Sequence, residues 1–451
     1  MVVSSLRLVN FRSYCDTTVR FGPGLNVVVG ENATGKTNLL EAAWFALRGS
    51  SPRTRRDEKL ITWGERFARV ELEVEDGDAG VQQVDVGFAP GQGKRVRWGG
   101  LEIASLDDLR GRSQVFIFVP ESLLLVKGSP ARRRAHLDAF AAGLDPQYAA
   151  AARDLAGVLR QRNAQLAAVK NGADPAALDP WDGQFARVAA ELGRRRRDLV
   201  DGLAAEFAEV ASALAPSGER FALRLTAQLA SVGYDADGLL EELRARRAGE
   251  VGRGLSLFGP HRDDIRFLEV GAAGAAPAAV RGVAAIGAAM PAAAADTTAT
   301  AAPPAVEEPI RVAVAGIPTA VGGPTCGPVE LPRGGRDLRL FGSQGEQRVA
   351  VLALLLAEQR LAAKRSGQQG PLFLDDVMSE LDDARRRLLV RMLATAGQAI
   401  ITTTNRQYFT NAELAEATLV ELPLDGSLAA GTALPAPDDE RPAAPPDLDA
   451  L

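Results

Sequence analysis

The residues best suited to chemistry form a glycine-rich segment near the start of the chain. It matches the Walker A pattern and lies between an apolar run at 25–29 and an apolar-periodic run that ends before Gly49. We predict a strand, a phosphate-binding loop and a helix, because glycines let amides curl around phosphates and a helix start attracts anions. Lys36 would contact the β- and γ-phosphates of ATP, and Thr37 would hold Mg²⁺. The predicted ATP contacts here are Gly30, Glu31, Asn32, Ala33, Thr34, Gly35, Lys36, Thr37 and Asn38.

A pair of acidic residues far downstream completes this predicted chemistry. The apolar run 371–374 ends in Asp375 and Asp376, which resembles a Walker B strand. Asp375 is predicted to bind Mg²⁺ together with Thr37. Asp376 is predicted to orient or deprotonate the attacking water, so that Asp376 and Lys36 are the catalytic candidates. Such a run is common by itself, so the interpretation depends on its pairing with the upstream loop.

A third motif, 343–348, opens a predicted helix over 349–361 and resembles the ABC-type signature. A serine followed by free amides at a helix start binds anions. The alternative is an ordinary capping box, and both can hold. In the ABC architecture this helix end points at the γ-phosphate held by a second subunit, which predicts an ATP-dependent homodimer. Its predicted ATP contacts are Ser343, Gly345, Glu346 and Gln347.

Two shorter segments fit the same pattern. Ser379–Asp382 resembles the D-loop, and the alternative is a solvated helix start. Ile400–Thr404 resembles the strand that leads to the switch loop, with Thr404 where most ABC ATPases have a histidine. The alternative for these threonines is plain β-strand propensity.

Composition limits the class of protein. The chain has 451 residues, 46% hydrophobic and 24% charged, as expected of a globular protein with two or three domains. No apolar run reaches the length of a membrane span, and Arg7 and Arg12 interrupt the N-terminus, which does not resemble a signal peptide. Cys15 and Cys326 have no metal-binding or redox spacing. We therefore expect a cytoplasmic protein with no membrane partner.

Changes in composition predict an α/β protein: a P-loop ABC-type ATPase head with a mixed sheet (lobe I) and a mostly helical lobe II. Lobe II helices are expected to be too short and too broken, at Asn171-Gly172 and Asp179-Pro180, for a long coiled-coil arm. The predicted segments are 1–125 with Walker A, 126–271 as helical lobe II, 272–335 as a flexible low-complexity insertion, 336–425 with the other motifs, and 426–451 as a disordered acidic tail.

Taken together, the motifs resemble the RecF family, whose ATPase head is similar to that of SMC-type proteins without their long arms. The resemblance implies ATP-dependent dimerisation, DNA binding and slow ATP hydrolysis. It also implies work with RecO and RecR in loading RecA at single-strand gaps and junctions. The insertion and the acidic tail depart from the family pattern. The segments that carry the resemblance are 10–14, 30–42, 51–53, 120–121, 125–128, 132–138, 259–264, 343–348 and 374–382.

Basic clusters are the candidates for DNA contact, because the net charge of −5 requires local patches. Phosphate contacts need such charges, although a solvated helix face is the alternative for each cluster. No base-reading motif is visible, so shape and backbone would be recognised in gapped, single-stranded or duplex DNA. His261 and Arg262 are predicted to be structural or interface residues. The DNA-binding candidates are Arg55, Arg56, Arg132, Arg133 and Arg134, with further clusters at 194–197 and 244–247.

Two other functions compete with this interpretation. An ABC transporter ATPase subunit would share the nucleotide motifs, but the Asn10–Tyr14 segment and Thr404 argue against it. An SMC-like architectural protein would need long heptad arms and a Cys-x-x-Cys hook, and the chain shows neither pattern.

Overall fold

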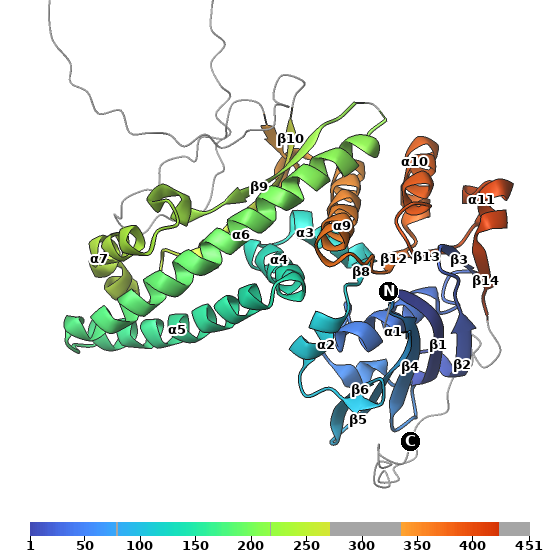
Figure 1. Ribbon diagram of the computed structural model, residues 1–451, viewed down its shortest axis with the longest axis horizontal. Helices are drawn as coiled ribbons and strands as arrows, with labels where there is room; N and C mark the ends of the chain where they lie inside the picture. The colour runs from blue at the N-terminus through green and yellow to red at the C-terminus, as the bar shows by residue number, and fades with distance from the viewer. Residues whose placement is uncertain (78–79, 217, 271–334, 424–451) are drawn as a thin grey trace, which may run out of the picture. The chain divides into compact units, whose positions relative to one another are not determined.

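The computed structural model describes residues 1–77, 80–216, 218–270 and 335–423 (Figure 1). The predicted tail at 426–451 and all but the last residue of the predicted insertion at 272–335 lie outside these described residues. Within them, one parallel and two antiparallel sheets are connected by helices. The predicted strand at 25–29 and the helix that ends before Gly49 are confirmed, and a strand at 399–403 contains four of the five residues of the predicted switch-loop strand at 400–404.

A five-stranded parallel sheet lies at the centre of lobe I. Its order is β14-β3-β13-β12-β8, so the Walker A strand β3 and the Walker B strand β12 flank β13. All three strands run the same way, and their carboxyl ends therefore meet at one edge. The bounds are β3 Leu25–Val29, β8 Phe116–Phe118, β12 Leu372–Asp375, β13 Ala399–Thr403 and β14 Thr418–Glu421.

Helix α1 (Lys36–Arg48) lies between this sheet and a six-stranded antiparallel sheet. Val28 and Phe373 of the parallel sheet and Leu6 of the antiparallel sheet share one core with Leu39 of α1. This double contact explains why α1 is buried on most of its surface. The antiparallel strands are β1 Val2–Phe11, β2 Tyr14–Arg20, β4 Ala68–Glu75, β5 Val81–Ala89, β6 Gly93–Trp98 and β7 Leu101–Glu102.

Helix α9 (Gln344–Ser366), which begins at the signature motif, covers the opposite face of the parallel sheet. Alternate strand residues such as Leu372 and Ile401 join the α9 side chains and lobe II in the largest core. The sheet therefore positions the loop on one face and the signature helix on the other. The shorter helices of this region are α2 Leu106–Arg112, α8 Leu338–Phe341, α10 Asp383–Leu393 and α11 Asn411–Glu416.

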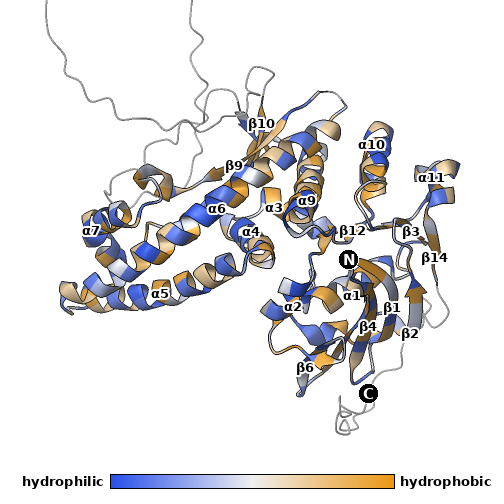
Figure 2. Cartoon of the chain, in the orientation of Figure 1, coloured by the Kyte–Doolittle hydropathy of each residue, from blue (hydrophilic) through white to orange (hydrophobic). Residues whose placement is uncertain are grey.

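Lobe II is built on long helices, which corrects the expectation of short ones. Helix α5 (Pro146–Lys170) has 25 residues and α6 (Asp179–Ala213) has 35, and both carry polar and apolar residues along their length (Figure 2). The predicted breaks are real, because Asn171 caps α5 and Asp179 begins α6, but they mark a single turn between two packed helices. The other helices are α3 Leu124–Lys127, α4 Pro130–Leu144 and α7 Ala236–Arg253.

Lobe II also contains a small antiparallel sheet that the composition did not predict. Its order is β11-β10-β9, with β9 at Phe221–Thr226, β10 at Asp264–Val270 and β11 at Gly335–Asp337. Its inner side chains, Leu223, Ile265 and Phe267, belong to the same core as α6 and α9. Among the described helices, none combines the length and apolarity that a bilayer crossing requires.

Candidate nucleotide site

The glycine-rich loop has the backbone geometry that a phosphate cradle requires. Gly35 precedes α1 with a φ of 99°, and no side chain caps the helix start, so its first amides remain free. A Cβ on Gly35 would lie 2.7 Å from the Tyr14 hydroxyl, and that hydroxyl donates to the Gly35 carbonyl oxygen at 3.1 Å. Only glycine therefore fits this position.

Lys36 is held inside the loop. Its Nζ donates to the carbonyl oxygens of Gly30 and Glu31, both at 2.7 Å. Burial lowers the pKa of Lys36 from its usual value, and the carboxylates of Asp376 and Asp375 oppose that effect. The Lys36 ammonium is therefore attracted to both carboxylates, and it can also bind an anion placed in the loop.

Thr37 and Asp375 meet although 338 residues separate them in the chain. The Thr37 hydroxyl lies 3.0 Å and 2.8 Å from the two carboxylate oxygens of Asp375. Burial raises the pKa of Asp375, and hydrogen bonds from Thr402 and Thr37 partly offset the increase. A hydroxyl and a carboxylate at this separation form the oxygen pair that Mg²⁺ takes in P-loop sites.

Asp376 follows directly with a strained backbone, at a φ of 47°. Its amide donates to the Thr402 hydroxyl at 3.0 Å, and its Oδ1 is buried without a hydrogen-bond partner among the described residues. Such an unsatisfied carboxylate oxygen next to a free helix start fits a site that receives a polar ligand. The residues present therefore fit both a triphosphate and Mg²⁺.

Thr402 is a site residue that the sequence interpretation missed. Its hydroxyl donates to Asp375 Oδ1 at 2.8 Å and accepts from the Asp376 amide, so it touches both acidic residues. Thr402 lies opposite Asp375 in the parallel sheet, and this position could have identified it as a site residue. The position follows only once β12 and β13 are known to pair. Thr404, the predicted substitute for the switch histidine, is half-buried.

Charged and polar residues of the 10–14 and 51–53 segments contact helix α1. Glu41 of α1 is buried and accepts from Arg12 at 2.9 Å and 3.0 Å, from Arg53 at 3.2 Å and from the Ser51 hydroxyl at 2.5 Å. Asn38 donates to the Ser13 hydroxyl at 3.0 Å. The 10–14 and 51–53 segments thus fix α1 against the antiparallel sheet, a role that their sequence pattern alone did not reveal.

The signature residues form the capping box that was the alternative interpretation. The Ser343 hydroxyl accepts from the Glu346 amide at 3.2 Å, and Glu346 accepts from the Ser343 amide at 2.6 Å. Ser343 is exposed, whereas Gln347 is buried and donates to the Leu338 carbonyl oxygen at 2.7 Å. In the described residues, no hydrogen bond or ion pair joins 343–347 to the phosphate loop of the same chain.

The predicted D-loop links the signature helix to the Walker B strand. Asp382 caps α10 by accepting from the Arg385 amide at 2.9 Å, so the helix-start alternative describes it correctly. Glu380 forms an ion pair with Arg348 of α9 at 2.7 Å. The Ser379 hydroxyl donates to the Asp376 carbonyl oxygen at 2.9 Å, which connects this segment directly to the acidic pair.

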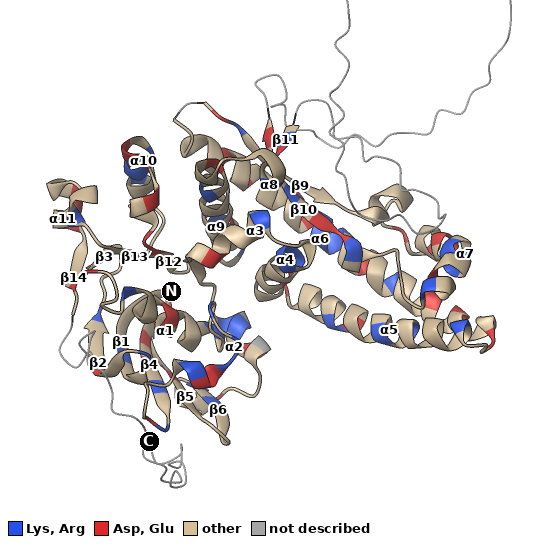
Figure 3. Ribbon diagram, turned by 180° about the vertical axis from the view of Figure 1, so that it is seen from behind, with Lys and Arg blue, Asp and Glu red and all other residues tan. Residues whose placement is uncertain are grey.

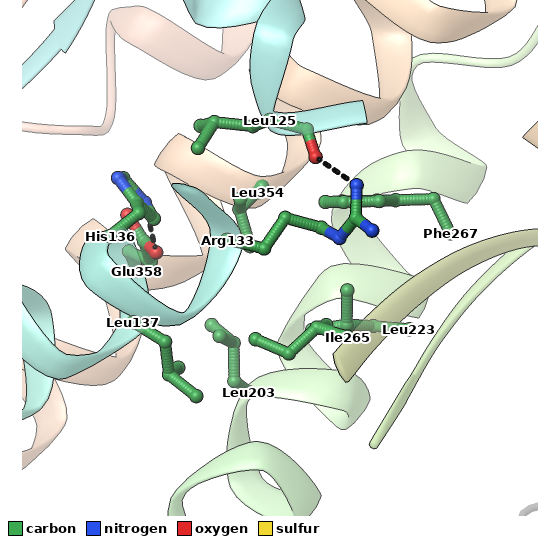
Figure 4. A pocket seen from close by; sticks show the side chains of 10 residues that line it. All are labelled: Leu125, Arg133, His136, Leu137, Leu203, Leu223, Ile265, Phe267, Leu354 and Glu358. Carbon is green, nitrogen blue, oxygen red and sulfur yellow. Dashed lines mark hydrogen bonds and ion pairs between the residues drawn. The ribbon is translucent and has the colours of Figure 1, made fainter. Parts of the chain in front are cut away.

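The structure separates the predicted DNA-binding arginines into two groups. Arg55, Arg56 and Arg132 are exposed, and no ion pair is found for them in the described part of the chain. Arg133 is only 4% exposed and binds both carboxylate oxygens of Asp264, at 2.7 Å and 2.9 Å. It lines a small internal cavity (Figure 4), so its prediction as a DNA contact is wrong. Arg134 is half-buried and donates to the Asp263 carbonyl oxygen at 2.7 Å.

The cluster at 194–197 is likewise engaged within the protein. Arg196 is buried between Asp138 and Asp263, and Arg195 forms ion pairs with Asp145 and Glu191. Basic and acidic residues accordingly follow one another closely along the ribbon of α6 (Figure 3). The 259–264 segment thus binds the buried arginines Arg133 and Arg196, and the structural or interface role of His261 and Arg262 stays a prediction. His261 contacts the Ser256 carbonyl oxygen at 3.1 Å.

Comparison with solved structures shows the fold. The chain is similar to the recombination mediator protein RecF with ATP in the RecFOR pathway, with a TM-score of 0.69 and 23% identity over 91% of this chain and 93% of that chain. It is also similar to an SMC head bound to the C-winged helix domain of ScpA, with a TM-score of 0.50 and 14% identity over 94% and 95%. The predicted class, a P-loop ABC-type ATPase head, is confirmed.

Comparison of sequences shows the family. Residues 5–119 match the family model described as an AAA domain. The chain is 31% identical to the DNA replication and repair protein RecF of Halalkalibacterium halodurans over 432 residues, which cover 94% of this chain and 98% of that protein. Since this identity extends over nearly the whole of both chains, the protein belongs to the RecF family of DNA replication and repair proteins.

Proposed function

We propose that this protein is a DNA-binding switch that dimerises around ATP and hydrolyses it slowly. The observation that carries the proposal is the convergence of Thr37 and Asp375, at 2.8 Å, beside Lys36 at an uncapped helix start. Membership of the RecF family favours this function over that of a transporter subunit or an SMC-like architectural protein.

Each residue of the site has a separate task in this proposal. Free amides at the start of α1 and the Lys36 ammonium bind the phosphates of ATP. Thr37 and Asp375 would hold Mg²⁺, and the ion would supply positive charge that stabilises the phosphates during hydrolysis. Asp376 accepts a hydrogen bond from the attacking water and orients it toward the γ-phosphate. Thr402 positions the two carboxylates relative to each other.

The signature residues would complete the site of a second subunit. Ser343 is exposed, and although its hydroxyl occupies the Glu346 amide, the amides of Gln344 and Gly345 at the start of α9 would bind an external ligand. A γ-phosphate bound there from the partner chain would add contacts across the dimer, and hydrolysis would remove them. The Arg348–Glu380 ion pair would transmit this event to the D-loop and the acidic pair.

The proposed partners follow from the family. One RecF structure similar to this chain is described as a recombination mediator in the RecFOR pathway. We propose that this protein likewise works with RecO and RecR and helps to load RecA at single-strand gaps. Exposed Arg55, Arg56 and Arg132 would contribute phosphate contacts that weaken with salt. DNA binding measured with and without ATP, on gapped and duplex DNA, tests this part.

Two variants test the composite site by sedimentation. Lys36→Ala should abolish the dimer that forms on addition of Mg-ATP, because the phosphates lose their cation. Ser343→Arg should bind ATP with unchanged affinity but remain monomeric, because the substituted side chain blocks only the contact in trans. An equal amount of ATP-induced dimer in Lys36→Ala, or loss of nucleotide affinity in Ser343→Arg, would contradict the proposed geometry.

A further inference from the structure

Three arginines lie together on the small sheet of lobe II and the helix beside it. Arg224 of β9 stands directly opposite Arg266 of β10 in the antiparallel register. Arg339 of α8 lines the same cavity of about 150 Å³ as Arg266. Arg224 and Arg339 are exposed, and Arg266 is half-buried. We call these three residues the arginine face.

The arginine face has more positive charge than nearby carboxylates balance: among the described residues that line the cavity, Asp264 is paired with Arg133, which leaves Asp337 beside the arginines. No ion pair is formed by any of the three in the described part of the chain. Asp264 binds Arg133 at 2.7 Å, and Asp337 caps α8 by accepting from the Arg339 amide at 2.9 Å. The positive charge in excess of Asp337 is therefore free to bind an external anion.

Elsewhere in the same sheet, an arginine lies opposite a residue of the opposite charge, unlike the Arg224–Arg266 pair. Glu269 of β10 lies directly opposite Arg336 of β11, and the Arg336 Nε is 2.6 Å from its carboxylate. Like charges at directly opposite positions destabilise a sheet, whereas opposite charges stabilise it. The Arg224–Arg266 pair thus costs stability in the free protein. A bound polyanion would remove this cost.

Exposed apolar side chains beside the arginine face indicate which polyanion fits. Leu340 is 69% exposed and lines the same cavity as Arg266 and Arg339, and Phe341, the next residue and the last of α8, is 59% exposed. Bases of a single strand stack on exposed aromatic rings while basic groups hold the phosphates. A duplex offers no unstacked base, so it would leave the ring unused. An acidic protein would use the charges without needing an aromatic ring.

We propose that the arginine face binds the phosphates of single-stranded nucleic acid and that Phe341 stacks on one of its bases. This inference rests on the proposed DNA-binding function, and it names the surface of lobe II on which a single strand would bind. The surface ends two residues before Ser343, where α9 begins, so strand binding there lies next to the proposed subunit contact.

The test compares Arg224→Ala/Arg266→Ala with Arg160→Ala/Arg187→Ala. The control removes two exposed arginines, from α5 and α6, that form no ion pair in the described residues. Binding of a labelled oligodeoxythymidylate in Mg-ATP should weaken about tenfold in the first variant and little in the control. The slope of log affinity against log salt should fall by about 1.4, because each lost single-strand phosphate contact contributes about 0.7. The first variant should also unfold at the same or a higher temperature, since it removes a repulsion.

Phe341→Ala tests the stacking contact, with Leu340→Ala as the control for loss of apolar surface. Phe341→Ala should weaken the single strand roughly five- to hundredfold, as expected for one stacked base, and leave a duplex of equal length nearly unaffected. Loss of the ATP-induced dimer in this variant would instead assign Phe341 to the subunit contact and overturn the stacking.

The remaining outcomes separate the two proposals. If wild-type protein binds neither probe, the proposed DNA-binding function fails together with this inference. If wild-type protein binds and the double arginine variant keeps both its affinity and its salt slope, only the arginine face is overturned. Displacement of the strand by polyglutamate at equal charge concentration would show that the surface prefers an acidic protein, and would also overturn it.

Discussion

A single hydroxyl organises both acidic residues of the nucleotide site. Thr402 donates to Asp375 and accepts from the Asp376 amide, and it is fully buried. The strained φ of 47° at Asp376 is therefore held by a specific contact from the neighbouring strand. A side chain of this shape without the hydroxyl would leave the Asp376 amide unsatisfied, at a cost of about 1–3 kcal/mol, and would leave Thr37 as the remaining hydroxyl on Asp375.

Thr402→Val should accordingly slow ATP hydrolysis about tenfold or more while the chain stays folded. ATP affinity should change less than the rate, because Lys36 and the loop amides remain in place. Thr403→Val is the matched control, since its hydroxyl contacts only Asn405 backbone groups on the same strand end. Steady-state hydrolysis and nucleotide binding measure the two effects. Equal rates in both variants would remove Thr402 from the site.

Adjacent arginines at the start of α4 should have opposite phenotypes. Arg133→Ala should destabilise the protein by about 3 kcal/mol, because it leaves Asp264 and several carbonyl groups without their buried partner. Arg132→Ala should change stability by less than about 0.5 kcal/mol, as expected of an exposed residue. Arg132→Ala should instead lower the salt slope of duplex binding by about 0.9. Denaturant unfolding and DNA titrations distinguish the two residues.

These arginines also show how far residue roles follow from sequence. Lys36, Thr37 and Asp375 could be placed together because the Walker patterns fix both residue type and local structure. A run such as Arg132–Arg134 shows only that the segment is basic. Which of these arginines is buried depends on contacts with Asp263 and Asp264, about 130 residues away. The arginine face shows the reverse case, since its members are dispersed over three elements and form no run.

At the scale of elements, a half-buried histidine and a buried glutamate connect lobe II to the signature helix. His136 of α4 lies 2.8 Å from Glu358 of α9, at the edge of the cavity in Figure 4. Burial acts to lower the pKa of His136, but the Glu358 carboxylate more than offsets it and raises that pKa above its usual 6.5. The charge of Arg48, at the end of α1, interacts with both His136 and Glu358. Three helices, α1, α4 and α9, therefore contribute to this group of charges.

The raised pKa predicts the direction of a pH effect on stability. A histidine with a higher pKa in the folded state contributes fully below 6.5 and loses its contribution as pH rises through the folded pKa. The difference in unfolding free energy between wild type and His136→Gln should therefore be largest below pH 6.5 and shrink above it. Asp263, whose pKa burial raises to about 6, is present in both proteins, so its titration cancels. A difference independent of pH would contradict the ion pair.

Some helices and strands could be predicted from the sequence, and others could not. Strand β3 and helix α1 follow from an apolar run, a glycine loop and a terminal Gly49. Strands β9 and β10 were not foreseen, because they lie within a chain segment dominated by helical periodicity and pair only with each other and β11. The helices of lobe II were expected to be short because of the breaks at Asn171-Gly172 and Asp179-Pro180, but α6 runs on for 35 residues after the second break, where α5, α7 and α9 pack against it.

At the scale of the whole molecule, the two parts of the proposed composite site share no hydrogen bond or ion pair within the described residues of one chain. The phosphate loop and acidic pair lie at one edge of the parallel sheet, and the contacts of Ser343–Gln347 in the described residues are all local. An exposed, capped helix start with no ligand group of its own is consistent with recognition in trans. If so, two defective chains should be able to form one working site.

A mixture of Lys36→Ala and Ser343→Arg chains tests this expectation directly. In the mixed dimer, one site combines both defects, whereas the other joins an intact loop to an intact signature helix. ATP hydrolysis should therefore reappear on mixing, at up to about half of the wild-type rate per chain, because neither variant pairs with itself and each mixed dimer has one intact site. A Lys36→Ala/Ser343→Arg double variant mixed with Lys36→Ala is the control and should stay inactive, because neither chain supplies an intact loop. Failure to recover any hydrolysis, with mixed dimers detected by sedimentation, would show that both sites must act together or that each chain completes its own.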